Sequence, residues 1–136
     1  MPIYADHRPL YKIAQILLVL AVSSRGGKSS MIRLHLFNWV MKENKRKDLL
    51  VNAAKNGGLN INVWGLDPFL NSAIQFALAE RLVERCSNGI SITEKGKVYI
   101  KIIQEDQILD EEYLYFKSLG KRITETMIEK ASESWG

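Results

Sequence analysis

The sequence holds one cysteine, two histidines and no long uninterrupted apolar run among its 136 residues. The single cysteine, Cys86, excludes a disulfide within the chain and argues against a zinc site built from cysteines. The longest apolar stretch, residues 13–22, is interrupted by Gln15 and is too short to span a bilayer, so it predicts a buried helix. Residues 1–9 lack the long apolar segment of a signal peptide, and we therefore expect a cytoplasmic protein.

Side chains that usually carry catalysis are also scarce. His7 and His35 lie in different segments, and neither has a carboxylate nearby at helical spacing. Two histidines without cysteine partners seldom form a structural metal site. No serine stands in a nucleophile elbow, and Cys86 fits a small apolar residue at a helix end. We therefore expect no catalytic residue, no metal and no cofactor, and an enzyme is the least supported class.

One loop has a superficial likeness to a nucleotide site. Residues 26–30, with the sequence Gly-Gly-Lys-Ser-Ser, match the end of a phosphate-binding P-loop. Val22 stands where that motif requires its first glycine, and a predicted helix precedes the loop where the motif needs a strand. These departures exclude an ATP site and favour a flexible basic loop, with contact to phosphate or a DNA backbone as the alternative.

The composition is otherwise that of a single globular domain, with 46% hydrophobic and 25% charged residues. The net charge of +4 is unevenly distributed. Residues 1–68 carry ten Lys or Arg and four Asp or Glu, whereas residues 69–136 carry nine and eleven. Such runs usually form solvated helix faces, but a basic edge for phosphate is the sharper hypothesis.

Apolar periodicity and loop residues predict a mainly helical chain with short strands. The predicted elements are helices over 9–22, 30–41, 48–55, 67–85 and from 94 onward, with strands over 59–64 and 90–92. Ser29 or Ser30 is the expected N-cap of the second helix, and Asp67 that of the fourth. Helical periodicity continues after residue 105, with an interruption at Gly120.

This order of elements favours a winged helix-turn-helix, a helical core followed by a small β-wing. Residues 77–97 resemble the end of the recognition helix, the wing and the following helix of winged-helix proteins. In those proteins a Leu or Ile followed by Thr-x-x-Gly closes the wing, as Ile92, Thr93 and Gly96 do here. We therefore predict a fold that is mainly α with a small β-wing: a winged-helix domain over 1–104, followed by a C-terminal helical extension over 105–136.

The predicted recognition helix is poorly suited to reading DNA sequence. Its charges over 67–85 sum to −1, and its first half offers only Asn71, Ser72 and Gln75 to a base edge. The basic residues lie in loops and around the wing instead, where they suit the phosphate backbone. The predicted nucleic-acid-binding residues are Arg25, Lys28, Lys45, Arg46, Lys47, Lys95 and Lys97.

The segment after the wing is long and rich in side chains that are favoured at protein interfaces. The predicted partner-binding residues are Tyr113, Tyr115, Phe116, Ile123 and Met127. The alternative is that this segment packs on its own domain, and the sequence does not choose between the two.

Several stretches together resemble a known family. They are residues 10–20, the loop over 23–30, and the helix over 33–39 that contains Leu-His-Leu-Phe-Asn-Trp, combined with the winged-helix stretch above. They resemble the small middle component of ABC-three-component systems, the group that includes Lamassu-type anti-phage defence. The resemblance implies a non-enzymatic winged-helix subunit whose partners are an SMC/Rad50-like ATPase and a larger effector, often a nuclease. It provides no catalytic motif to carry over.

Two hypotheses of function follow. The first is an accessory subunit that bridges the ATPase and the effector in defence against phage or plasmids, and that assists weak, sequence-independent binding to the backbone of double-stranded DNA. The second is a stand-alone, homodimeric winged-helix transcriptional regulator that binds a short palindrome.

Overall fold

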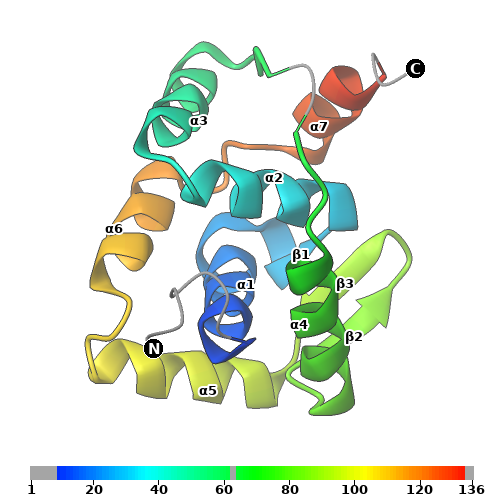
Figure 1. Ribbon diagram of the computed structural model, residues 1–136, viewed down its shortest axis with the longest axis vertical. Helices are drawn as coiled ribbons and strands as arrows, with labels where there is room; N and C mark the ends of the chain where they lie inside the picture. The colour runs from blue at the N-terminus through cyan, green and yellow to red at the C-terminus, as the bar shows by residue number, and fades with distance from the viewer. Residues whose placement is uncertain (1–8, 62–63, 134–136) are drawn as a thin grey trace.

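The computed structural model describes residues 9–61 and 64–133 (Figure 1). It is mainly helical with a small antiparallel sheet, as the sequence predicts at this level. The helices are α1 (Pro9–Ser23), α2 (Met31–Met41), α3 (Asn44–Asn56), α4 (Pro68–Ala79), α5 (Glu94–Glu105), α6 (Asp110–Leu119) and α7 (Glu125–Ser132), with a 3-10 turn η2 (Arg25–Gly27). The strands are β1 (Lys28–Ser29), β2 (Val83–Cys86) and β3 (Gly89–Ile92).

Helix α1 lies at the centre of the molecule, between α4, α5 and α6 (Figure 1). Its sequence is apolar on nearly every side, and every residue from 12 to 20 is buried. A helix with no polar face is stable only when other elements cover it on all sides. Among the described residues, no helix combines the length and the apolar character needed to cross a membrane.

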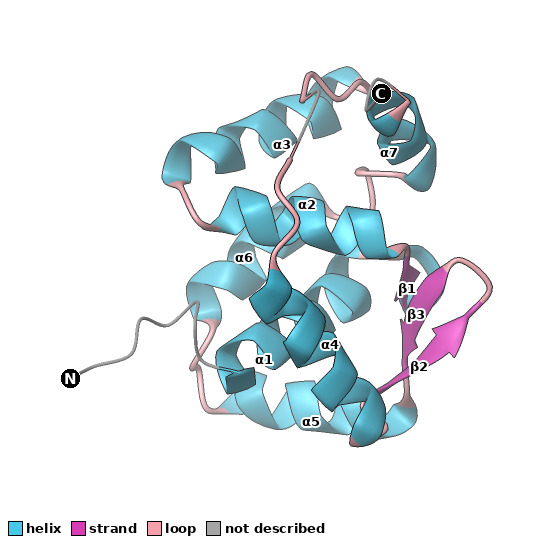
Figure 2. Ribbon diagram, turned by 45° about the vertical axis from the view of Figure 1, so that its right-hand side comes forward, coloured by secondary structure: helices cyan, strands magenta, loops and turns pink. Residues whose placement is uncertain are grey.

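The three strands form a sheet in the order β1–β3–β2, with both pairings antiparallel (Figure 2). Strand β1 is an addition to the predicted elements: Lys28 pairs with Ser91, and Ser29 pairs with Ile90. Gly27 has φ +68°, which turns the chain from η2 into β1. Gly89 lies so close to β1 that a Cβ atom would stand 2.0 Å from the Ser29 carbonyl oxygen. The basic loop is thus held against the hairpin.

Two predicted elements are corrected. The helix predicted over 67–85 ends at Ala79, because Arg81 takes a left-handed φ of 60° and Val83–Cys86 forms strand β2 against β3. The strand predicted over 59–64 is absent from its described residues, 59–61 and 64. Ile61 and Trp64 are both buried there, and the Trp64 indole donates a hydrogen bond to the Ile32 carbonyl at 3.0 Å. The loop is therefore anchored by side chains, without backbone pairing.

The C-terminal helices share the hydrophobic core of the rest of the chain. Helix α6 packs on α1 and α3, and α7 packs on α2. The Ser23 hydroxyl donates to the Phe116 carbonyl at 2.8 Å, across 93 residues of sequence. Gly120, with φ +57°, ends α6, so the interruption in the sequence pattern is a true helix end.

Candidate functional site

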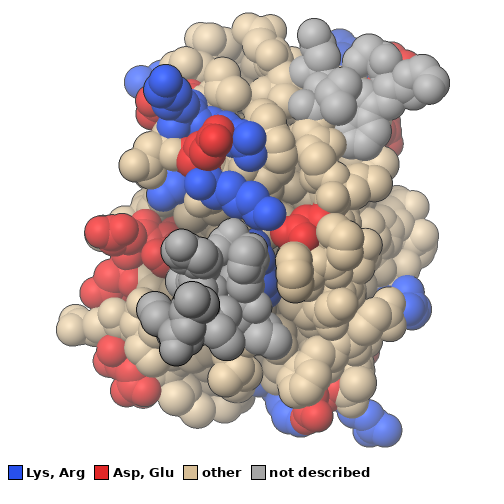
Figure 3. Space-filling view, in the orientation of Figure 1, with Lys and Arg blue, Asp and Glu red and all other residues tan. Residues whose placement is uncertain are grey.

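The predicted nucleic-acid-binding residues lie in three separate places. Arg25 and Lys28 line a pocket beside the β2–β3 hairpin. Lys45, Arg46 and Lys47 lie in the first turn of α3, and Lys95 and Lys97 lie in the first turn of α5. Figure 3 shows Lys and Arg side chains gathered over α3, with acidic side chains below them over α6. The fold thus divides the predicted set into three patches.

The basic side chains of α3 are partly used within the chain. Arg46 stacks over the Trp39 ring at 4.0 Å, donates to the Trp39 carbonyl at 3.0 Å and pairs with Glu43 at 2.9 Å. Lys47 lies 5.8 Å from the Tyr115 ring, whose hydroxyl donates to the Lys47 carbonyl at 2.7 Å. Lys45 is exposed. Arg46 and Lys47 therefore have structural contacts at the α2–α3 corner and at α6.

The two lysines of α5 also have partners within the chain. The Lys95 ammonium donates to the Glu80 carbonyl at 2.8 Å, at the C-terminal end of α4. Lys97 pairs with Glu94 at 3.1 Å, and both groups are exposed, so this pair contributes little to stability. Thr93 caps α5 through the Gly96 amide at 3.0 Å, and a Cβ atom on Gly96 would stand 2.2 Å from the Leu82 carbonyl oxygen. The Thr-x-x-Gly motif is therefore a close-packing motif.

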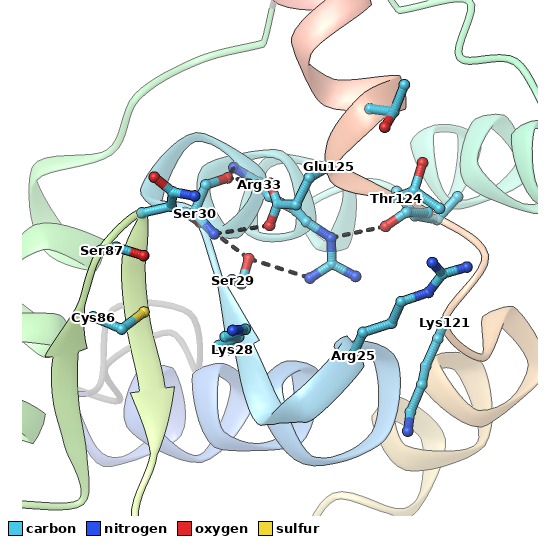
Figure 4. A pocket seen from close by; sticks show the side chains of 13 residues that line it. Arg25, Lys28, Ser29, Ser30, Arg33, Cys86, Ser87, Lys121, Thr124 and Glu125 are labelled. Carbon is cyan, nitrogen blue, oxygen red and sulfur yellow. Dashed lines mark hydrogen bonds between the residues drawn. The ribbon is translucent and has the colours of Figure 1, made fainter.

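The pocket beside the hairpin brings together segments that are far apart in the sequence (Figure 4). Its volume is about 240 Å³. Its lining residues come from the loop after α1, the start of α2, the hairpin tip and the link between α6 and α7: Arg25, Lys28, Ser29, Ser30, Arg33, Cys86, Ser87, Asn88, Lys121, Ile123, Thr124, Glu125 and Thr126. Lys121, which the sequence analysis missed, joins Arg25 and Lys28 here. All three are exposed.

Arg33 is a buried cation behind this pocket, with 3% of its surface exposed. Its guanidinium donates to the Ile123 carbonyl and to the Ser24 hydroxyl, both at 2.8 Å, and to the Ser29 hydroxyl at 3.2 Å. It also donates to the Ser23 carbonyl. All of these acceptors are neutral. Burial lowers the pKa of Arg33 to about 10, although Glu125 opposes that change, so the group is charged at neutral pH.

Glu125 is the one carboxylate among the described residues that line the pocket. Its two oxygens accept from the Ser30 amide at 3.0 Å and from the Ser30 hydroxyl at 2.7 Å. The same hydroxyl accepts from the Arg33 amide at 3.2 Å, so Ser30 is the N-cap of α2. A carboxylate at a helix N-terminus is stabilised by the helix dipole. Glu125 therefore ties the start of α7 to the start of α2.

Three of the predicted partner-binding residues lie in the hydrophobic core of the chain. Phe116 and Ile123 are fully buried, and Met127 is 9% exposed. They pack against the chain's own helices because α6 and α7 fold back on α1 and α2. Tyr113 and Tyr115 are half-buried, and burial raises the pKa of the Tyr115 hydroxyl. The C-terminal segment thus follows the alternative that it packs on its own chain.

Other large apolar side chains are exposed, among them Leu114 on α6, and helix α4 holds two of them. None of the twelve residues of α4 is charged. Phe69 is 55% exposed and Phe76 is 47% exposed. They are seven residues apart and therefore lie on the same face of the helix, with Ser72 between them. A pocket of about 270 Å³ adjoins Phe76 and is lined also by Leu10 and Tyr99. The sequence analysis missed this face, although the seven-residue spacing of the two phenylalanines could have indicated it.

A buried polar network fixes α4 against α2. Asp67, the predicted N-cap of α4, accepts from the Phe69 amide at 2.9 Å and from the Asn38 amide group at 3.0 Å, and pairs with Lys42 at 3.0 Å. Burial opposes ionisation, but the hydrogen bonds from Lys42, Asn38 and Phe69, with the Lys42 charge, outweigh it and lower the pKa of Asp67 to about 2. The buried Lys12 ammonium donates to the Asn38 side-chain oxygen.

His35 belongs to the same network. The Asp67 amide donates to its Nδ1 at 3.1 Å, so Nδ1 is unprotonated, and Nε2 lies 3.0 Å from the Asn71 side-chain oxygen, to which it donates. Burial lowers the pKa of His35, against the opposing effects of Asn71 and Asp67. The histidine is 4% exposed and thus lies in the interior, where it joins the start of α4 to α2.

Comparison with family models, with curated proteins and with solved structures finds no match. Within the part of the chain that the structure describes, no three His, Cys, Asp or Glu residues gather in a way that holds a metal ion. The geometry offers two surfaces for recognition: the cationic pocket beside the hairpin and the uncharged, phenylalanine-bearing face of α4.

Proposed function

We propose that this chain is a winged-helix accessory subunit that docks on a larger protein through helix α4. The order α1, β1, α2, α4, β2, β3 and the sheet order β1–β3–β2 support the winged-helix assignment. In that assignment α4 takes the place of the recognition helix, the β2–β3 hairpin is the wing, and α3 is an insertion between α2 and α4.

The observation that carries the docking proposal is the chemistry of the α4 face. A helix that enters the major groove contacts a densely charged polyanion and usually presents Arg, Lys, Asn or Gln to it. Helix α4 exposes Asn71 and Gln75, but it has no Arg or Lys to attract the phosphates and it also exposes Phe69 and Phe76. Exposed aromatic side chains next to a pocket are typical of protein-binding surfaces. The face is thus better suited to a protein than to a base edge.

The resemblance to the middle component of ABC-three-component systems supplies the kind of partner. In this proposal the chain bridges an SMC/Rad50-like ATPase and an effector subunit in defence against phage or plasmids. The ATP site and any nuclease site lie on those partners. Arg25 and Lys28 assist the assembly by contacting the backbone of double-stranded DNA without reading its sequence.

The test is a nuclease-treated pull-down of the tagged chain from its own host, with co-purifying chains identified by mass. We expect a large SMC-like ATPase in near-stoichiometric amount. The double variant F69Q/F76Q should lose it, because the buried apolar area of both rings is removed from the interface. The matched control is Leu114→Gln, which changes a 63% exposed leucine on α6 and should retain the partner.

Two outcomes would overturn the proposal. Loss of the partner with Leu114→Gln but not with F69Q/F76Q would move the docking surface to α6. Recovery of the chain alone, as a dimer by light scattering that binds a short palindrome, would favour the stand-alone regulator instead.

A further inference from the structure

The pocket beside the hairpin has a charge imbalance that its own residues do not neutralise. Arg25, Lys28, Arg33 and Lys121 line it, against the single carboxylate of Glu125 among the described lining residues. These cations come from the loop after α1, from α2 and from the link after α6, so folding alone brings them together (Figure 4). Gathering like charges around one cavity raises its positive potential and attracts an anion.

Arg33 adds a cation that water screens poorly. Its side chain is bonded to carbonyl and hydroxyl oxygens, none of them charged. A buried guanidinium without a bonded carboxylate keeps its field, because the surrounding protein has a lower dielectric constant than water. Arg33 is thus a fixed positive charge behind the pocket, while Arg25, Lys28 and Lys121 are exposed and free to close on a ligand.

The lining selects the class of anion. Apart from the cations and Glu125, it consists mostly of hydroxyl and amide side chains, with Ser87 and Asn88 at the hairpin tip and Thr124 and Thr126 opposite. Such groups suit the several oxygens of a phosphate, and the volume of about 240 Å³ exceeds what a single phosphate group needs. The hairpin tip at its edge lies where, in our winged-helix assignment, the wing lies beside a duplex.

We infer that this pocket binds a phosphate of the nucleic-acid backbone through Arg25, Lys28 and Lys121, in competition with the carboxylate of Glu125. This inference rests on the DNA contact in the proposed function and specifies its site. Glu125 already holds the Ser30 amide and hydroxyl, at 3.0 and 2.7 Å, as an internal anion. A phosphate that enters the pocket is repelled by the carboxylate of Glu125 and is attracted by the side chains of Arg25, Lys28 and Lys121.

The experiment measures binding of the isolated chain to a fluorescent duplex of mixed sequence, about 20 base pairs long, by anisotropy over a series of salt concentrations. The variant R25E/K121E should weaken binding at low salt by tenfold or more and lower the salt slope by about 2, since each phosphate contact contributes about 0.9. The control K55E/K101E changes the net charge equally at exposed lysines outside the pocket and should weaken binding less than about threefold.

Glu125→Gln gives a readout in the opposite direction. The amide keeps an oxygen for the Ser30 amide but removes the negative charge, so binding to the duplex should tighten about threefold or more. Equal weakening by R25E/K121E and K55E/K101E would overturn the inference, because only net charge would then matter. Unchanged binding with R25E/K121E would overturn it as well.

A second arm distinguishes the source of the phosphate. Inorganic pyrophosphate is titrated into the chain without DNA, and chemical shifts are followed by NMR. If pyrophosphate binds wild type and not R25E/K121E, while duplex binding is the same for both, the ligand is a small phosphate compound and the nucleic-acid inference fails. The isolated chain needs no partner in these assays. Failure here therefore leaves docking through α4 untouched, and failure of the pull-down leaves this inference untouched.

Discussion

Arg33 on α2 and Asp67 at the start of α4 are both buried ions, yet their charges are balanced in different ways. Arg33 is bonded to four neutral oxygens, whereas Asp67 is paired with Lys42 at 3.0 Å and accepts from two amide groups. Both pKa values are lowered, that of Arg33 to about 10 by burial and that of Asp67 to about 2, where its hydrogen bonds and Lys42 outweigh burial. A lowered pKa means a disfavoured charge for a base and a favoured charge for an acid.

The difference separates a structural site from a binding site. The Asp67 region is electrostatically complete, because it holds its own cation and its own hydrogen-bond donors. The Arg33 region holds an excess of positive charge, which an external anion would complete. The same fold therefore uses one buried ion to fix the angle of α4 and the other to support a pocket.

The largest expected loss of stability comes from removing Asp67. Asp67→Ala removes the cap of α4, the acceptor of the Asn38 amide group and the carboxylate that pairs with Lys42, so the free energy of unfolding should fall by about 3 kcal/mol. Urea denaturation followed by circular dichroism measures it. Asp48→Ala, at an exposed position on α3, is the matched control and should change stability by less than about 0.5 kcal/mol. A loss below about 1 kcal/mol for Asp67→Ala would contradict the comparison.

Removing Arg33 should lower the free energy of unfolding by a smaller amount. Arg33→Met leaves the Ile123 and Ser23 carbonyls unpaired, but it also removes a desolvated charge, so we expect a loss of about 1.5 kcal/mol. The same denaturation experiment compares the two variants directly. If Arg33→Met were the more damaging change, the charge of Arg33 would be compensated within the chain after all.

The smallest effect is a dependence on pH that belongs to His35. Because its pKa is lowered in the folded state, the unfolded chain takes up a proton near pH 6.5 while the folded chain does not. Stability is therefore full above that pH and falls as the pH is lowered through it. Asp67 is ionised in both the folded and the unfolded chain above about pH 5, so it adds no slope between pH 5.5 and 7.5. Thermal unfolding at about pH 7.5 and 5.5 should show the fall in wild type, and His35→Gln should reduce it.

Features fixed by neighbouring residues were predictable from the sequence. The cap of α2 (predicted at Ser29 or Ser30), the cap Asp67, the strand over 90–92 and the buried helix after Pro9 all follow from local chemistry. Strand β1 was not predictable, because its two residues pair with Ser91 and Ile90, about sixty positions away. The helix predicted over 67–85 failed for a different reason: β2 and β3 are joined by a two-residue turn, so the pairing is local, but the apolar spacing of Leu78 and Leu82 continued the helical pattern across it.

The candidate site was likewise only partly predictable from the sequence. Arg25 and Lys28 were visible as a basic loop, but Lys121 enters the pocket only because α6 and α7 fold over α2. Phe116, Ile123 and Met127 have the composition of an interface, and only the tertiary structure shows that they face α1, α2 and their neighbours. Composition alone does not distinguish a core from a docking surface, because the hydrophobic effect drives both.

The central position of α1 has a consequence for biosynthesis. This helix is translated before α6, which is part of its cover and includes Phe116 and its bond to Ser23. Its apolar surface therefore lacks that cover until residue 119 has been translated and has emerged. During that interval the nascent chain is exposed to aggregation and is a suitable client for a chaperone that binds apolar helices.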